Sequence, residues 1–139
     1  MSSTKLPDIR QTQILNAPIE KVWKAVTTPE GFSAWFMPGN VQPVVGHEFL
    51  LEAGPFGQSP CKVLEVEAPR RMSIAWAKDW TLTFELADLG EGRTEFTLIH
   101  GGWDAEKVTE FGQPHPQVRE HMGQGWTGIG RKLAQYVEG

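Results

Sequence analysis

Near the N-terminus, the spacing of hydrophobic residues changes from the alternation of a strand to the three- or four-residue steps of a helix. This change predicts a strand followed by two helices. Ile9 to Leu15 alternates weakly, as a strand does. Asn16-Ala17-Pro18 then opens a helix, because proline fits a first turn in which its missing N–H is not needed. Thr28 is suited to cap a second short helix that starts at Pro29. The apolar positions of the two helices are Ile19, Val22, Trp23, Val26, Phe32, Trp35 and Phe36.

From Val41 onward, hydrophobic residues recur at every second position, which is the spacing of strands. The clearest example runs from Trp80 to Leu86, and Gly90-Glu91-Gly92 after it predicts a hairpin turn. Pro43 cannot donate to a sheet, so the first strand of this region is expected at an edge. The pattern predicts strands over residues 41–45, 47–53, 61–67, 72–77, 80–86 and 93–100, and a short helix over 104–111.

The C-terminal part, from Pro116 to Val137, predicts one long amphipathic helix. Its apolar positions recur at steps of three or four and comprise Val118, Met122, Gly125, Ile129, Leu133 and Tyr136. A glycine inside a helix costs about 1 kcal/mol relative to alanine, so helices rarely carry several. This helix contains Gly123, Gly125, Gly128 and Gly130. These glycines indicate either a space between the helix and a sheet or close backbone packing. The sequence pattern is consistent with both.

The order of elements predicts an α+β fold in a single domain over residues 1–139. Short connections between consecutive strands favour an antiparallel meander of about six to seven strands. Such a sheet has one apolar face, and the long C-terminal helix is the only predicted element large enough to cover it. The expected architecture is a curved sheet gripping a long helix, with two short helices beside it.

Composition and charge argue against two classes of partner, nucleic acids and the membrane interior. The net charge of -4, without a basic run, argues against nucleic acid as a partner. Since no apolar stretch approaches the length that spans a bilayer, we expect no integral membrane contact. The polar start of the chain lacks a signal-peptide core, and the single Cys61 fits a reducing environment, so a cytoplasmic location is predicted.

Four segments together resemble the heat-shock-protein ATPase activator homologue-like family of the START-like, helix-grip superfamily. They are Ala17 to Trp23 with Thr28-Pro29-Glu30 and Trp35, then Val63 to Met72, Phe96 to Gly102, and Gly125-Trp126 followed by Leu133. The resemblance implies a deep apolar cavity between the sheet and the last helix, which admits lipid-like or polycyclic molecules. Relatives include lipid carriers and polyketide cyclases, and the eukaryotic namesake activates a chaperone ATPase in the stress response. That namesake has an additional N-terminal domain that contacts the chaperone, for which we expect no counterpart here.

Candidate residues for such a cavity come from the inner faces of the predicted strands and helix. His100 shares a face with Phe96 and Leu98, so it is expected to point inward as a hydrogen-bonding group, a general base or a satisfied core histidine. Gln11 and Gln13 share the parity of Ile9, so they either form a polar end of the cavity or, if the strand register shifts, face outward. The other candidates are Trp76, Trp80, Phe84, Phe49, Leu51, Leu98, Gly125, Met122 and Ile129.

Other groups give weaker signals. The Gly54 to Pro60 loop, with Phe56 at its tip, would either gate a cavity or be a plain surface loop. His115 and His121 lack the spacing that places two ligands on one helix face, so neither a metal nor another cofactor is predicted. Cys61 has no nucleophile pattern near it and is expected to be a structural thiol.

Three functions remain open from the sequence. The first is binding or carriage of a small hydrophobic, lipid-like or polycyclic molecule. The second is a cyclase or aromatase reaction with His100 as the base, which ranks lower because no acid/base pair is evident on the inner face. The third is a protein-interaction module related to chaperone regulation and stress response.

Overall fold

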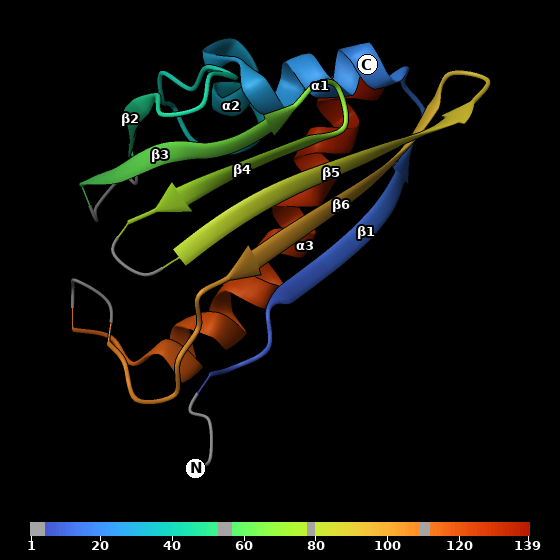
Figure 1. Ribbon diagram of the computed structural model, residues 1–139. Coiled ribbons are helices and arrows are strands. Elements are labelled where there is room, and N and C mark those ends of the chain that lie inside the picture. The colour runs from blue at the N-terminus through green and yellow to red at the C-terminus, as the bar shows by residue number, and fades with distance from the viewer. Residues whose placement is uncertain (1–4, 53–56, 78–79, 109–111) are drawn as a thin grey trace.

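The computed structural model describes residues 5–52, 57–77, 80–108 and 112–139, which form an antiparallel sheet with helices against one face (Figure 1). The α+β, helix-grip prediction is confirmed. The elements in chain order are β1 (Ile9–Leu15), α1 (Ile19–Thr27), α2 (Pro29–Trp35), β2 (Glu48–Glu52), β3 (Gln58–Glu67), β4 (Arg71–Trp76), β5 (Trp80–Gly90), β6 (Arg93–Gly101) and α3 (His115–Glu138).

The six-stranded sheet has the order β1-β6-β5-β4-β3-β2, and every neighbouring pair is antiparallel. Strands β2 to β6 form the predicted meander, and β1 adds beside β6, where Gln11 faces Leu98. The β5–β6 hairpin turns at Glu91 and Gly92, whose φ angles are 55° and 71°. Two successive positive φ angles match the right-handed twist of the flanking strands.

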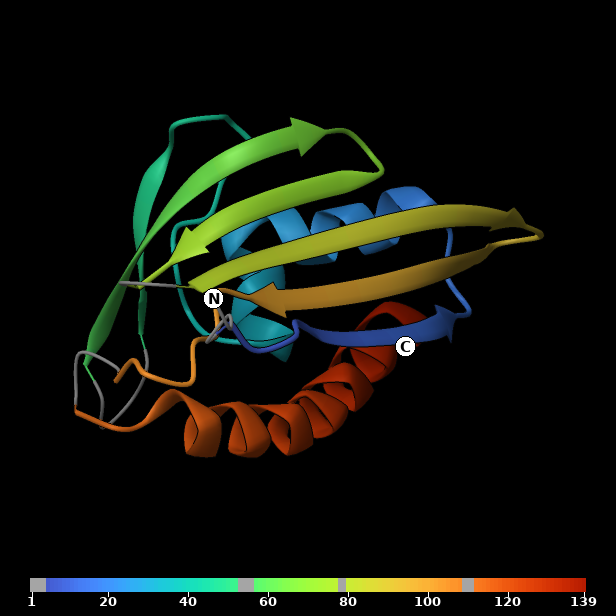
Figure 2. The same cartoon turned by 60° about the horizontal axis from the view of Figure 1, so that its bottom comes forward.

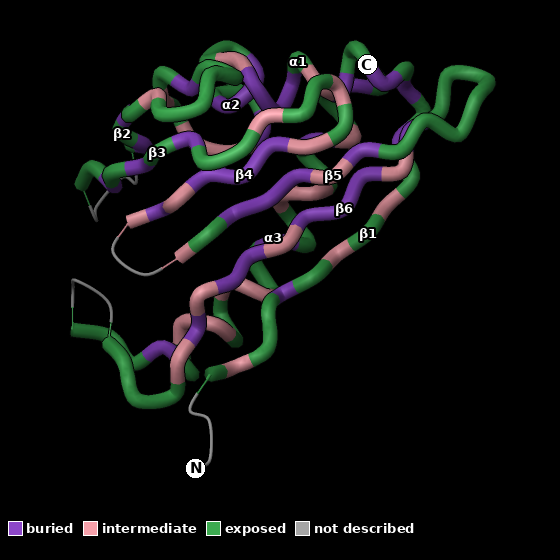
Figure 3. Tube along the Cα trace, viewed as in Figure 1, coloured by how far each residue is buried: buried purple, intermediate pink, exposed green. Residues whose placement is uncertain are grey.

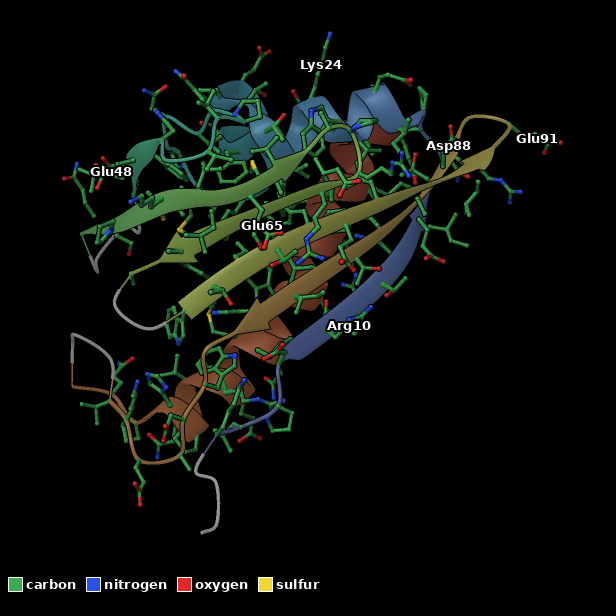
Figure 4. All side chains as sticks on the ribbon, in the orientation of Figure 1. Arg10, Lys24, Glu48, Glu65, Asp88 and Glu91 are labelled. Carbon is green, nitrogen blue, oxygen red and sulfur yellow. The ribbon has the colours of Figure 1, made fainter. Side chains whose placement is uncertain are left out.

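All three helices lie on the same side of the sheet, and Figure 2 shows the strands bending over them. The tube in Figure 3 shows buried residues concentrated along the central strands β4, β5 and β6. Thr28 caps α2 as predicted, because its Oγ1 accepts from the N–H of Gly31 at 3.1 Å. The opposite face of the sheet carries polar side chains, among them Arg10 and Glu65 (Figure 4). No helix of the described residues is long and apolar enough to cross a membrane.

The predicted strand over 41–45 is wrong. Val44 and Val45 are exposed, and the N–H of Val44 donates to the carbonyl of Gln42 at 2.8 Å in a turn. Pro43 has no N–H to contribute to a ladder, which favours this turn over a strand. Strand β2 therefore lies at the edge of the sheet, and the segment before it reaches β2 through the contact of Glu52 N–H with the carbonyl of Pro38, at 2.8 Å.

The helix predicted over 104–111 is also wrong across the described residues 104–108. There the N–H of Lys107 donates to the carbonyl of Asp104 in a single turn, and Val108 forms an isolated bridge with Pro114. Residues 109–111 lie outside the described residues. Residues 104–108 therefore form an irregular turn instead of a helix.

The buried face of α3 is rotated relative to the predicted one. Trp126 and Val137 are buried, whereas Gly125 and Tyr136 are exposed. The indole of Trp126 accounts for this rotation, because its N–H donates into the core to His100. The residues buried on α3 are His115, Trp126, Leu133 and Val137.

Candidate functional site

A partly open cavity of about 370 Å³ lies between the β1–β6 side of the sheet and helices α2 and α3. Its place, between the sheet and the C-terminal helix, is the one expected from the sequence. The residues that line it are Gln11, Thr12, Gln13, Trp35, Phe96, Leu98, Trp126, Thr127, Gly130 and Arg131.

The apolar wall is built from side chains of three elements: Phe96 and Leu98 of β6, Trp35 of α2 and Trp126 of α3. Phe96 and Leu98 point inward because they alternate with outward residues along β6. Trp35 comes from α2 and is held by its own hydrogen bond, in which Nε1 donates to the carbonyl of Ala25 at 2.7 Å. Its ring meets that of Phe96 nearly at right angles, with the ring centroids 6.3 Å apart. The wall is therefore fixed by core packing.

The polar wall comes from β1 and α3. Gln11 and Gln13 face inward as predicted and donate to carbonyls of the helix. The side-chain amide of Gln11 donates to Gly123 at 3.0 Å, and that of Gln13 donates to Gly130 at 3.1 Å. Arg131 adds a cationic side chain at the exposed side of the cavity. The cavity thus combines an aromatic wall with hydrogen-bonding groups at its opening.

His100 does not line this cavity. It is fully buried at the end of β6, behind Trp126, whose Nε1 donates to His100 Nδ1 at 3.1 Å. An indole can only donate, so Nδ1 accepts and the proton of the neutral imidazole sits on Nε2. The carbonyl of His100 accepts from Trp103 Nε1 at 2.9 Å. His100 is the centre of an aromatic cluster, which we name the His100 cluster: His100, Trp76, Trp80, Trp103, His115 and Trp126.

The surroundings of His100 hold it in the uncharged form. Burial lowers the pKa of His100 from 6.5 to about 3, and the neighbouring His115 acts in the same direction. Moving a charge out of water is unfavourable, which explains the direction of the shift. A histidine with so low a pKa is a weak base at neutral pH.

The other predicted site residues separate into three places. Trp76 and Trp80 belong to the His100 cluster, and Phe84 packs in the core against Trp35 and Phe96. Phe49 and Leu51 are buried on β2, where Phe49 stacks on His47.

Besides Gln11 and Gln13, Leu98 alone of the candidate residues lines this cavity. Met122 and Ile129 are half-buried on α3 and pack against the core. Gly125 is exposed, with open space where a Cβ would lie, so it neither borders the cavity nor makes a close contact.

Three weaker sequence signals concern the loop at Phe56, Cys61 and a metal site. Phe56 and residues 53–56 lie outside the described residues, whereas Gln58 to Pro60 belong to strand β3 and not to the predicted loop. Cys61 is buried, and burial raises the pKa of its thiol to about 12. No group of three potential ligands in the described segments could hold a metal ion.

Comparison with known proteins assigns the chain to a family. Residues 16–138 match the family described as Activator of Hsp90 ATPase homolog 1-like protein. The chain belongs to this family. Among curated proteins, none matches it.

Solved structures show how widely this family's fold is shared. The Bacillus halodurans protein BH1534 is 42% identical, with a TM-score of 0.86, and the match covers 96% of this chain and 99% of that one. CalU16 from Micromonospora echinospora is 25% identical, with a TM-score of 0.74 over 94% of this chain and 75% of that one. An HSP90 activator from Plasmodium falciparum shares the fold at 21% identity, with a TM-score of 0.71 over 88% and 89% of the two chains.

Sequence reasoning missed several wall residues of this family member, above all Trp126 and Trp35. Trp126 follows Met122 by four residues and precedes Leu133 by seven, so the helical spacing already contained it. The predicted apolar face included Gly125, and a face centred on that residue leaves out Trp126. Arg131 and Thr127 could not be identified as cavity residues from the sequence, because polar residues are common on the exposed face of any helix.

Proposed function

We propose that the protein binds a small, flat, largely hydrophobic molecule in the cavity between β1, β6, α2 and α3. The observation that carries this proposal is the 370 Å³ cavity with Trp35, Phe96, Leu98 and Trp126 along one wall. Ligand pockets typically measure about 300–1,000 Å³ and combine apolar walls with a few polar groups.

The chemistry of the walls supports a polycyclic or lipid-like ligand. Burying apolar ligand surface contributes about 25 cal/mol per Å², and aromatic rings offer faces for stacking. The polar groups at the opening suit a ligand with one hydrophilic end. Gln11 and Gln13 offer amides, and Arg131 offers a charge.

A cyclase or aromatase reaction has less support. The residues that line the cavity include no carboxylate, and His100 is separated from it by Trp126. The low pKa of His100, about 3, leaves little driving force for removing a proton from a ligand.

The direct test is a titration with polycyclic and lipid-like compounds, followed by tryptophan fluorescence, since Trp35 and Trp126 line the cavity. We expect saturable quenching. Thr127→Trp should weaken binding about tenfold or more, because a large side chain at this lining position occupies the opening. Gln124→Trp is the matched control: it is exposed on the same helix but does not line the cavity. Equal affinity in both variants, measured by calorimetry, or no binding in the wild type, would contradict the proposal.

A chaperone partner is a second candidate. Its support is the family description and the shared fold of the Plasmodium falciparum HSP90 activator. A cytoplasmic location and a role in stress response would follow from such a partner. The test is the ATPase rate of a purified Hsp90 with and without the protein, and an unchanged rate would contradict it.

A further inference from the structure

Four buried side-chain N–H groups in the described part of the chain have no hydrogen-bond partner; Arg71 Nε lies in an ion pair with Glu65, and the other three belong to one cluster. These three are Nε2 of His100 and the Nε1 atoms of Trp76 and Trp80. A buried donor without a partner is unfavourable, because it has lost its hydrogen bond to water, and such groups are rare in folded proteins. Three in one place therefore need an explanation.

The rings that carry the three donors lie side by side. The ring centroids of Trp76 and Trp80 are each 5.0 Å from that of His100, and 5.2 Å from each other. These rings come from the ends of three neighbouring strands, since Trp76 ends β4, Trp80 begins β5 and His100 lies near the end of β6. The antiparallel pairing places these strand ends together: Trp76 faces Trp80, and Leu82 of β5 faces His100.

The cluster offers donors and little else. Nδ1 of His100 already accepts from Trp126, and the carbonyl of His100 already accepts from Trp103. The three free donors are neutral, because His100 carries one ring proton and indoles are uncharged. Neutral donors in an aromatic setting suit an uncharged oxygen better than a carboxylate, whose burial without a cation is costly.

Trp126 connects this cluster to the cavity. Its ring lines the cavity, and its N–H donates to His100. A ligand group that passes the edge of this ring, with its hydrogen bond to His100 kept, therefore reaches the donor cluster next.

We propose that the N–H groups of His100, Trp76 and Trp80 bind a carbonyl oxygen of the ligand, which is thus an aromatic ketone or quinone-like molecule. This inference rests on the proposed function, because the hydrocarbon part of the ligand occupies the cavity. It adds a second requirement, namely an uncharged acceptor at one edge of the ring system.

The test compares fluorenone with fluorene, which share a tricyclic shape and differ in one carbonyl group. We expect the wild type to bind fluorenone about tenfold more tightly, the contribution of roughly one net hydrogen bond. Trp76→Phe removes one free donor and keeps an aromatic ring, so it should reduce this preference about threefold or more while leaving fluorene affinity nearly unchanged.

Trp103→Phe is the matched control, since the N–H it removes already has the carbonyl of His100 as its partner. It should retain the preference for fluorenone. In the wild type, the indole N–H signals of Trp76 and Trp80 should shift downfield in nuclear magnetic resonance spectra when fluorenone binds, and not when fluorene binds.

The outcomes separate the two proposals. Equal binding of both compounds would support the cavity and overturn the carbonyl site. It would indicate that the donors point at ring faces instead, as the perpendicular arrangement of Trp80 and His100 permits. Equal preference in Trp76→Phe and wild type would also overturn the carbonyl site. Binding of neither compound would overturn both proposals for aromatic ligands.

Discussion

At the residue scale, His100 shows how burial can remove the usual chemistry of a side chain. It has the residue type of a base, yet an aromatic cluster surrounds it and its exposed fraction is 0%. Its Nδ1 is occupied by Trp126. The residue therefore acts as a neutral hydrogen-bonding group that fixes the orientation of Trp126, and hence one wall of the cavity.

The lowered pKa predicts a specific loss of stability in acid. Unfolded His100 takes up a proton below pH 6.5, while folded His100 does so only near 3, so the unfolded state binds more protons in this window. This contribution is fully present above 6.5 and is lost as the pH falls, by about 1.4 kcal/mol per pH unit. His100→Gln, whose amide oxygen can still accept from Trp126, should show a shallower loss. Urea unfolding of both proteins across the window measures the difference, and parallel curves would contradict it.

Cys61 should be unreactive for a related reason. The thiolate is the nucleophilic form, and burial raises the pKa of this thiol to about 12, although a backbone hydrogen bond partly opposes the shift. We expect alkylation by iodoacetamide to be slow in the native protein and fast after unfolding in urea. Mass spectrometry follows the modification, and equal rates in the two states would contradict the assignment of Cys61 as a structural thiol.

At the scale of elements, α3 is held by a few specific contacts along its length. Trp126 and Leu133 are buried, and the amides of Gln11 and Gln13 reach the carbonyls of Gly123 and Gly130 from β1. Open space surrounds the Cα atoms of Gly123, Gly125 and Gly128 on the side where a Cβ would lie. Tight packing therefore does not explain these three glycines.

Two helical glycines should respond in opposite ways to alanine. Gly128→Ala should stabilise the protein by about 0.5–1 kcal/mol, because the methyl group meets nothing and the helix gains propensity. Gly31→Ala should destabilise it by about 1–3 kcal/mol, since the new Cβ would overlap the backbone of Ala25 in α1. Denaturant midpoints measure both effects. A destabilising Gly128→Ala would show that α3 packs more closely than described.

The strands were more predictable from the sequence than the irregular segments. Alternation places β1 at Ile9–Leu15 and locates β5, because a half-buried sheet imposes a period of two. The same alternation gave a wrong prediction at Val44 and Val45. There, Pro43 has no N–H for strand pairing, and the backbone forms a local turn. Short apolar runs without a defined partner strand carry too little information to separate these outcomes.

The cavity was predictable in place but not in composition. Parity along β1 and β6 correctly turns Gln11, Gln13 and Leu98 inward. The rotation of α3 depends on long-range contacts that no local pattern encodes, among them the hydrogen bond from Trp126 to His100. For that reason the sequence predicted that His100 lines the cavity. In the structure, Trp126 lies between His100 and the cavity.

At the scale of the whole molecule, the cavity joins parts of the chain that are distant in sequence. Its walls come from β1, α2, β6 and α3, so the ligand proposed here would contact both halves of the fold. Ligand that binds only the native state stabilises the whole cooperative unit by mass action.

This coupling predicts a thermal shift. A ligand at about one hundred times its Kd should add about 2.7 kcal/mol and raise the Tm by roughly 10 °C. Thr127→Trp should show a much smaller shift at the same ligand concentration, whereas Gln124→Trp should match the wild type. Differential scanning fluorimetry with a nonfluorescent ligand checks this, and equal shifts in the two variants would place the ligand outside the cavity.

The β5–β6 hairpin is a suitable site for attaching the protein to a solid surface. Its turn at Glu91 and Gly92 extends away from α3, with Asp88 and Glu91 at its tip, and nothing lies within 4 Å of where a Cβ on Gly92 would be (Figure 4). Exposed turn tips tolerate inserted sequence well. A short peptide handle inserted between Glu91 and Gly92 would immobilise the protein on a sensor surface through a turn that does not line the cavity.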